Sequence, residues 1–379
     1  MFSNAVKLLT LNGFDIKLDP SWALIAALIT WSLSQHYFPS TYPDQGTATY
    51  LVMAIAAMLL FFMSLLLHEL AHSVVARRFG MQVKSITLFL FGGVAETGSE
   101  PETARAEFWV ALAGPVVSLA LAFSFRSLGA LASLSQGLSA ATAVFAYLSF
   151  INLALALFNL LPAFPLDGGR ILRAYLWNKS GDALKATEIA ARSGAILSYV
   201  LMGFGLLALF QGAVVTGLWQ IMIGGFLLVA ARAGYQQQLV RVVFGNRSVG
   251  EVMRRNPVTV DPRMTLSEFA NDIVLQQGVS FVPVVENGVL LGHIDQSMLA
   301  KIDRENWIST RVDDVFVGLD DASTIPADMP VQDLLARISG SGTRKYLVTS
   351  GHCLLGVISL ADLVRYLNWS DPARGAIAR

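Results

Sequence analysis

Six stretches of 18 to 30 mostly apolar residues constrain the fold of this chain more than any other feature. A helix needs about 20 apolar residues to cross the hydrocarbon core of a bilayer. We therefore predict an α-helical membrane domain with about six transmembrane helices. The predicted spans are Ser21–Phe38, Tyr50–Phe79, Phe108–Leu128, Ala140–Leu161, Ile189–Phe210 and Val214–Ala233.

Charged residues are unevenly distributed along the 379 residues. Residues 1–245 hold 14 basic and 11 acidic side chains, and the shorter segment 246–379 holds 13 and 16. This change in charge density places a domain boundary near residue 245, with the membrane domain before it and a soluble domain after it. Neither segment has the strongly basic balance of a nucleic-acid-binding protein, so we expect no nucleic-acid partner.

Lysine and arginine also predict the orientation of the spans, because cytoplasmic loops are enriched in them. With the N-terminus inside, the inner segments of residues 1–245 collect 13 basic side chains and the outer segments collect only Arg126. We see no removable signal peptide at the N-terminus. The expected location is the cell (plasma or inner) membrane, as a multi-pass protein whose N-terminus and residues 246–379 are both cytosolic.

The second predicted span ends in the motif HExxH, formed by His68, Glu69 and His72. Residues four apart lie on one face of a helix, so both imidazoles can reach one metal ion. Glu69 points elsewhere and is positioned to act as the general base of a zinc hydrolase. Ionisable groups inside an apolar span are costly and indicate function.

A catalytic zinc takes three protein ligands and keeps one open position. The other histidines are poorly placed, because His36 lies at the outer end of the first span and His293 and His352 lie in the soluble segment. A carboxylate is therefore the natural third ligand.

The fourth predicted span supplies this carboxylate where it runs into the sequence NLLPAFPLDGGR. Pro162 and Pro165 cannot lie in a regular helix interior, so they unwind the chain at that end of the span. Irregular backbone at membrane depth is tolerated where it lines a cavity. Asp167 is then expected at the depth of the two histidines, and Gly168 and Gly169 allow a sharp turn into a short helix from Arg170.

The paired motifs HELAH and NLLPAFPLDGGR resemble those of the site-2 protease family of intramembrane zinc metalloproteases. The resemblance covers roughly residues 20–240. It implies one zinc ion per chain bound by His68, His72 and Asp167, with Glu69 as the catalytic base. It also implies that Asn159 and Pro165 shape the active-site loop, with Asn159 helping to polarise the scissile carbonyl.

Between the second and third spans, Gln82–Thr97 is too short to cross a membrane and has a β-strand pattern that breaks at Gly92 and Gly93. In site-2 proteases the corresponding segment is a membrane-associated sheet, whose edge is able to pair with an unwound substrate strand. A purely structural hairpin is the alternative. The acidic side chains that follow, Glu107 included, are interpreted as a solvated loop, and Gly114-Pro115 as either a helix kink or a tight packing point.

Residues 246–379 contain two similar units of about 60 residues, over about 246–306 and 308–370, in which strands and helices alternate. The pattern resembles a pair of cystathionine-β-synthase-type (CBS) domains, an α/β module that often binds adenine nucleotides. Ser359 and Asp362 match that family's nucleotide-binding positions. The equivalent positions of the first unit are Asp295 and Met298, so at most one ordinary nucleotide site is supported. Dimerisation through this module is the alternative role.

The leading hypothesis is regulated intramembrane proteolysis of single-span transmembrane proteins within the lipid bilayer, modulated by a nucleotide at the CBS pair. A transporter or channel gated by its CBS pair is the first alternative, but it predicts inverted repeats that the sequence lacks. An inactive homologue is the second, although all four expected catalytic residues are present. A di-metal oxidase requires a second Glu-x-x-His helix, which is absent from the sequence.

Overall fold

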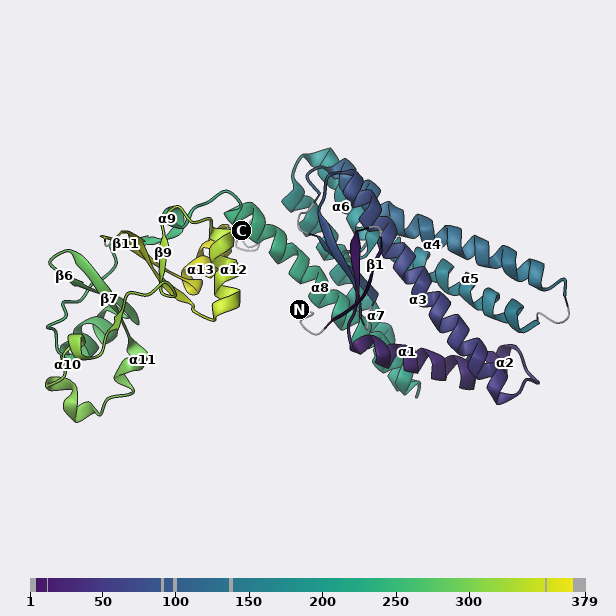
Figure 1. The fold of residues 1–379 in the computed structure, drawn as a ribbon, viewed down its shortest axis with the longest axis horizontal. Coiled ribbons are helices and arrows are strands. Elements are labelled where there is room, and N and C mark those ends of the chain that lie inside the picture. Colours follow the sequence, from purple (N-terminus) through teal and green to yellow (C-terminus); the bar gives the residue numbers. More distant parts are fainter. Residues whose placement is uncertain are drawn as a thin grey trace. The chain divides into compact units, whose positions relative to one another are not determined.

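The computed structural model describes residues 5–11, 13–89, 92–97, 101–135, 139–351 and 353–370. It divides into two compact units, Met1–Tyr235 and Gln236–Arg379. The division falls ten residues before the boundary expected near residue 245, because the last residues of a long helix pack into the core of the second unit. Figure 1 shows the elements of both units.

The first unit is dominated by long helices. Its helical elements are α1 (Ser21–Ser32), η1 (Leu33–Tyr37), α2 (Phe38–Thr41), α3 (Thr47–Arg78), α4 (Ala104–Ala132), α5 (Ser139–Asn159), α6 (Asp167–Ser180), α7 (Ala183–Phe210) and α8 (Val214–Phe244). Five of these described helices, α3, α4, α5, α7 and α8, are long and apolar enough to cross a membrane. They correspond to five of the six predicted spans, which confirms the helical membrane domain.

The first predicted span is built differently from the other five. A π-helical turn, η1, separates α1 from α2, so no single α-helix in this stretch reaches the length of a span. The three pieces nevertheless follow one another without a break from Ser21 to Thr41.

A four-stranded sheet accompanies the helices. Its strands are β1 (Val6–Leu11), β2 (Phe14–Leu18), β3 (Val83–Phe89) and β4 (Gly92–Thr97), in the order β1-β2-β3-β4. The strand pattern predicted over Gln82–Thr97 is confirmed as the antiparallel hairpin of β3 and β4. The hairpin of β1 and β2 was not predicted; β2 joins the sheet by pairing parallel to β3.

The buried face of this sheet packs against the end of α3 that carries the HExxH motif. Phe14, Ile16 and Ile86 are fully buried, and the Arg77 guanidinium lies 3.7 Å above the centre of the Phe14 ring. A cation over an aromatic face is attracted by the ring quadrupole. The sheet therefore fixes the C-terminal turns of α3.

Helices α3, α4 and α5 run side by side, and α4 also packs against α6 (Figure 1). Pro115 lies inside α4, and the assigned α-helix continues through it from Ala104 to Ala132. The acidic residue Glu107, interpreted from the sequence as part of a solvated loop, is instead 1% exposed within α4. That interpretation was wrong because the first turn of α4 is buried against Arg173 of α6, whose guanidinium lies 3.0 Å from the Glu107 carboxylate.

The second unit contains two α/β cores, as the repeat pattern predicted. Its first part comprises α9 (Val249–Val252), β5 (Arg254–Arg255), α10 (Leu266–Glu268), η3 (Phe269–Leu275), β6 (Phe281–Glu286), β7 (Val289–Asp295), α11 (Gln296–Leu299), η4 (Arg304–Ile308) and η5 (Val312–Asp314). Its second part comprises β8 (Val317–Gly318), β9 (Thr324–Pro326), α12 (Val331–Ser341), β10 (Lys345–Ser350), β11 (Cys353–Ser359) and α13 (Leu360–Ser370).

The two repeats exchange their flanking strands. The sheets have the orders β5-β11-β10-β9 and β6-β7-β8, so β5 completes the sheet of the second repeat and β8 that of the first. The sheet of each repeat, predicted over about 246–306 and 308–370, therefore includes one short strand from the other repeat. The exchange ties the repeats into one module.

Candidate metal centre

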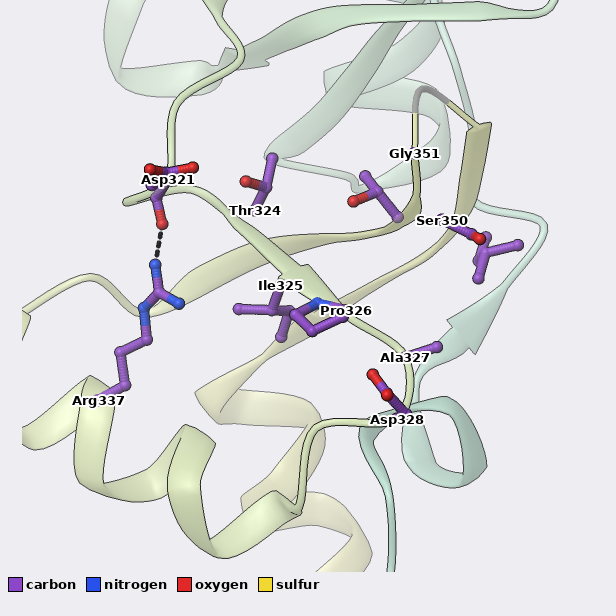
Figure 2. Close-up of a pocket in the computed structure, with 11 residues that line it drawn as sticks. Asp321, Thr324, Ile325, Pro326, Ala327, Asp328, Arg337, Ser350 and Gly351 are labelled. Carbon is purple, nitrogen blue, oxygen red and sulfur yellow. Dashed lines mark hydrogen bonds between the residues drawn. The ribbon is translucent and has the colours of Figure 1, made fainter.

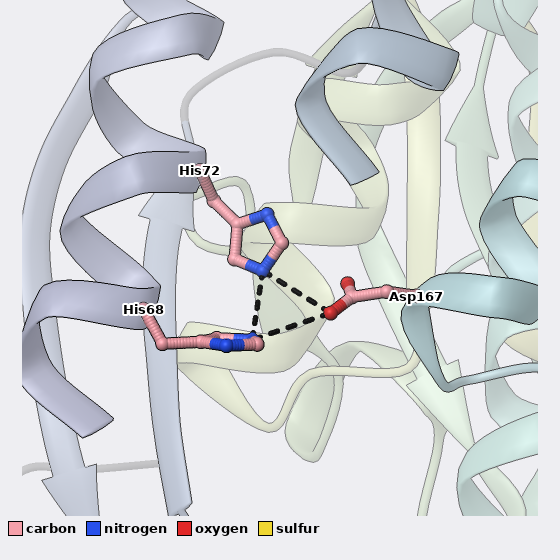
Figure 3. A group of neighbouring side chains, drawn as sticks. All are labelled: His68, His72 and Asp167. Carbon is pink, nitrogen blue, oxygen red and sulfur yellow. Dashed lines mark hydrogen bonds and ion pairs between the residues drawn. The ribbon is translucent and has the colours of Figure 1, made fainter. Parts of the chain in front are cut away.

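Two histidines of α3 and the first residue of α6 converge in the membrane unit (Figure 3). The Nε2 atoms of His68 and His72 lie 3.1 Å apart, and each lies 3.3 Å from Oδ2 of Asp167. The three residues are 2%, 7% and 7% exposed, respectively. The structure thus brings together the three residues that the sequence predicted as metal ligands.

The second ring nitrogen of each histidine bonds to α4. Nδ1 of His72 lies 2.7 Å from the carbonyl oxygen of Val110, and Nδ1 of His68 lies 2.8 Å from Oγ of Ser118. A carbonyl oxygen only accepts, so the proton of His72 belongs on Nδ1 and its Nε2 carries the lone pair. Outer contacts of this kind fix the tautomer and orientation of metal-binding histidines.

The spacing of the three inner atoms fits a tetrahedral zinc ion. Zinc binds histidine nitrogen and carboxylate oxygen at about 2.0–2.2 Å, which puts two ligands of a tetrahedron about 3.3 Å apart. The measured separations of 3.1 to 3.3 Å match this value. Within the described residues, this is the one group of three or more His, Cys, Asp or Glu side chains arranged to hold a metal ion.

Asp167 reaches the histidines through the predicted break after α5. The helix ends at Asn159, the chain turns through residues 160–166, and α6 begins at Asp167, three residues before the expected start at Arg170. A Cβ on Gly168 would collide with the backbone of Leu160, and a Cβ on Gly169 would collide with that of Phe164. The two glycines, predicted to allow a sharp turn before the helix, lie inside its first turn and let it pack directly on the loop.

Gly114 of α4 packs tightly against the two ligand side chains of α3. A Cβ at this position would lie 2.5 Å from Nε2 of His68 and closer still to Nε2 of His72. The absence of a side chain leaves the space beside the ligand atoms open. A tight packing point was one of the two alternatives for Gly114-Pro115, but the sequence does not show which helix or which side chains approach.

Glu69 lies partly exposed beside the centre, with its side chain against Gly93 of β4. A Cβ on Gly93 would lie 3.0 Å from Cδ of Glu69 and closer still to Cγ. Strand β4 is an edge of the described sheet, since β3 is its only neighbour in the strand order. The structure therefore brings an edge strand of the sheet, at Gly93, to the predicted general base.

The other residues predicted for the active-site loop are less closely connected. Asn159 is the last residue of α5 and is partly exposed, and the described residues show no hydrogen bond from its side chain. Pro165 lies in the loop between α5 and α6 and follows a cis peptide bond. The buried amide side chain of α5 is that of Asn152. It donates to the Leu148 carbonyl oxygen at 2.8 Å and to Oγ of Ser64 at 3.3 Å.

In the second unit, the predicted nucleotide-binding residues Ser359 and Asp362 form a hydrogen bond with each other at the start of α13. The Ser359 hydroxyl donates to the Asp362 carboxylate at 2.6 Å, and Arg254 contacts the other carboxylate oxygen at 3.2 Å. Lys345 binds Asp295 of the first repeat at 2.6 Å. Burial opposes ionisation of Asp295, but hydrogen bonds from Lys345 and Ser297 outweigh it and lower its pKa.

A cavity of about 610 Å³ lies in the second repeat, at the end of the β-hairpin opposite Ser359 (Figure 2). It is lined by residues of β9, of the turn at Ser350 and Gly351, and by Arg337 of α12, which donates a hydrogen bond to the Asp321 carbonyl oxygen. Ser359 and Asp362 are not among its lining residues. The structure therefore does not join this cavity to the predicted nucleotide-binding pair.

Comparison with known proteins identifies both parts of the chain. The model of peptidase family M50 matches residues 56–136 and 123–201, and the CBS domain model matches residues 249–305 and 313–368. The curated protein "Putative zinc metalloprotease Rip3" of Mycobacterium tuberculosis is 35% identical over 370 residues, covering 96% of this chain and 93% of that protein. The chain belongs to peptidase family M50.

A second curated relative agrees with this assignment to the M50 (site-2 protease) family. "Zinc metalloprotease MJ0392" of Methanocaldococcus jannaschii is 32% identical over 310 residues, which cover 82% of this chain and 84% of that protein. The solved structure "Site-2 Protease from Methanocaldococcus jannaschii" is 28% identical, with a TM-score of 0.41, over 60% of this chain and 94% of that one. The M50 family with a CBS pair, expected from the two motifs, is confirmed.

Proposed function

We propose that this M50 family member is an intramembrane zinc metalloendopeptidase that hydrolyses peptide bonds within or beside the transmembrane segments of single-span proteins. The convergence of His68, His72 and Asp167 within 3.1 to 3.3 Å of one another carries this proposal. The three ligand atoms leave the fourth position of a tetrahedron for water or substrate, as catalytic zinc sites require.

Different residues of the chain have different roles in peptide hydrolysis. Zinc, when held by these ligands, supplies Lewis-acid polarisation of the peptide carbonyl and acidifies a bound water. Glu69 accepts the proton of the attacking water and passes it to the leaving amine, as the glutamate of HExxH does. The bonds from Val110 and Ser118 to the outer ring nitrogens keep His72 and His68 oriented toward the centre.

The edge of β4 provides a surface along which an extended substrate segment would reach Glu69. A scissile bond inside a helix is shielded by the helix's own hydrogen bonds, so the substrate must first be extended. An extended segment gains backbone hydrogen bonds when it pairs with an exposed sheet edge. Because Gly93 lies against Glu69, a strand paired along Gly92 and Gly93 would pass close to the general base.

Cleavage by the purified full-length chain tests this function. We expect the wild type, reconstituted with a single-span model protein, to yield two fragments whose new N-terminus mass spectrometry places in or beside the span. Glu69→Gln should retain zinc but lose cleavage at least a hundredfold, the typical contribution of a general base. Wild-type protein that contains zinc and binds the model protein without cutting it would support the inactive-homologue alternative.

We also propose that the CBS pair binds an adenine nucleotide beside Ser359 and Asp362, and that this binding modulates cleavage. The support is local: a hydroxyl, a carboxylate and the Arg254 guanidinium lie together at the start of α13. Calorimetry of the full-length chain with AMP and ATP should show binding that Asp362→Ala weakens. Equal affinity in wild type and variant would place the nucleotide away from Asp362, and no binding to the wild type would leave dimerisation as the role of the module.

A further inference from the structure

A groove of about 720 Å³ lies between α3 and α4. It is apolar along nearly its whole length. Its lining residues are Leu67, Leu70, Ala71, Val74, Val75 and Arg78 of α3, Phe79 just after it, and Trp109, Leu112, Ala113, Val116 and Val117 of α4. The small side chains of Ala71 and Ala113 make the hollow between the larger residues.

The groove lies on a surface that lipid would contact. Trp109 and Val116, on its α4 wall, are 48% and 51% exposed although they belong to one of the five apolar helices. From Leu67 to Arg78 the α3 wall spans about 16 Å at the helical rise per residue, roughly half the thickness of the hydrocarbon core. The groove thus has the length of one leaflet, which is the length of a single acyl chain.

One end of the groove carries positive charge. Arg78, the last residue of α3, is exposed and is the one charged residue among those that line it. Arg105 precedes Trp109 by four residues on α4, so the two share a face and Arg105 lies one turn nearer the helix N-terminus. Among the described residues neither guanidinium has an acidic partner. Trp109 lies at the same end, and tryptophan is enriched at membrane interfaces.

We propose that the α3–α4 groove binds one anionic phospholipid, with an acyl chain between the apolar walls and the headgroup phosphate at Arg78 and Arg105. The charge at a single end, the apolar length and the interfacial tryptophan fit this molecule together. An apolar transmembrane protein segment would match the apolar walls but would leave the guanidiniums of Arg78 and Arg105 without an anion.

The bound lipid would contact residues that neighbour the metal ligands in the sequence. Leu67 and Ala71 precede His68 and His72 on α3, and Ala113 precedes Gly114 on α4. Filling the groove therefore steadies the two helix walls whose inner faces hold the ligands and their outer hydrogen bonds. This inference concerns binding, and it stands or falls separately from the proposed peptidase activity.

Native mass spectrometry of the full-length protein tests the proposal. The detergent-solubilised chain is titrated with phosphatidylglycerol or with phosphatidylcholine of the same acyl chains. We expect one phosphatidylglycerol to bind about fivefold more tightly than phosphatidylcholine, the effect of roughly one basic residue at an anionic surface. Arg78→Gln should remove this preference, and Ala113→Leu should weaken the binding of both lipids by filling the hollow.

Two substitutions elsewhere on α4 serve as matched controls. Arg126→Gln removes an exposed charge, and Ala130→Leu enlarges an exposed side chain, at positions that do not line the groove. Both should bind lipid like the wild type. Lipid binding that Arg78→Gln and Ala113→Leu leave unchanged would overturn the proposal. So would an Ala113→Leu variant that keeps its lipid and loses only affinity for a single-span protein.

Discussion

At the scale of single residues, the metal centre depends on Gly114, because glycine has no side chain. Gly114 brings the backbone of α4 against the ligand nitrogens of His68 and His72, which is a contact no other residue type would allow. Val110 and Ser118, one turn to either side of it, orient the two rings. One face of α4 therefore supplies both the space and the outer hydrogen bonds of the centre.

Replacing Gly114 by alanine tests this contact. The new methyl group would occupy the space beside both Nε2 atoms, so we predict that Gly114→Ala lowers zinc occupancy and reduces cleavage at least tenfold. Gly129→Ala on the same helix is the control, because its Cβ would meet Phe145 at an ordinary 3.4 Å. Zinc content measured by elemental analysis decides the matter. Full zinc occupancy in Gly114→Ala would show that the centre tolerates the methyl group.

The sequence was sufficient to find the ligand residues but not their surroundings. His68, His72 and Asp167 could be predicted because metal chemistry restricts the residue types and because HExxH fixes the spacing on a helix. The approach of Gly114 to these histidines and the contacts of Val110 and Ser118 could not, because they depend on the register in which α4 packs against α3. That register is set by the whole helix interface, and no short motif records it.

At the scale of elements, α6 is positioned by polar contacts as well as by packing. Its Arg173 pairs with Glu107 of α4, and both side chains are almost completely buried. Near its start, Gly168 and Gly169 lie against the preceding loop. These contacts place Asp167 relative to α3 and α4.

The buried pair gives a prediction for stability. Glu107→Gln leaves the Arg173 charge buried without its counter-charge, which typically costs about 3–5 kcal/mol. Thermal unfolding in detergent should therefore begin at a clearly lower temperature than in the wild type. Glu188→Gln is the matched control, since its partner Arg192 is exposed and an exposed pair contributes about 1 kcal/mol or less. Similar unfolding temperatures for the two variants would contradict the role given to the buried pair.

A loop contact predicts a second effect at this scale. A Cβ on Gly194 of α7 would collide with the Phe164 carbonyl oxygen, in the loop that leads to Asp167. We expect Gly194→Ala to shift this loop and to reduce cleavage at least tenfold, with a smaller loss of zinc than Asp167→Ala causes. Gly203→Ala, on the same helix and with nothing within 4 Å of its Cβ, should behave like the wild type. Equal activity of the two variants would show that Gly194 does not position the loop that leads to Asp167.

Elements were predicted from the sequence where hydrophobicity was strong and missed where it was weak. Five spans stood out because they are long apolar runs. The hairpin of β1 and β2 was overlooked, although alternating apolar residues flank Asn12-Gly13, a dipeptide typical of tight hairpins. The exchange of β5 and β8 between the CBS repeats was not predictable, because two-residue strands have no pattern of their own.

At the scale of the whole molecule, the chain joins a membrane unit to a module with two α/β cores. The distribution of lysine and arginine places the N-terminus and the CBS pair on the cytosolic side, and this orientation is our proposal. It would put the metal centre near the cytosolic end of α3 and expose the CBS pair to cytosolic nucleotides. Dimerisation, the alternative role of the same module, would then also take place in the cytosol.

The single cysteine makes the orientation measurable. Cys353 is exposed on β11, so a membrane-impermeant maleimide should label it in lysed cells and leave it unlabelled in intact spheroplasts. Ser135→Cys in a Cys353→Ser background is the control, because Ser135 lies beyond the outer end of α4 and should react without lysis. Labelling of Cys353 in intact spheroplasts would reverse the proposed orientation.

The zinc content of the purified chain tests the central claim most directly. Elemental analysis should find about one zinc per wild-type chain, and Asp167→Ala and His68→Ala should each lose it while eluting as folded protein. Asp362→Ala removes a carboxylate from the CBS pair and should keep the metal. Loss of zinc from both site variants would show that residues of α3 and α6 bind the same ion in one three-ligand centre. Well-folded wild type without zinc, or zinc retained after Asp167→Ala, would contradict the centre described above.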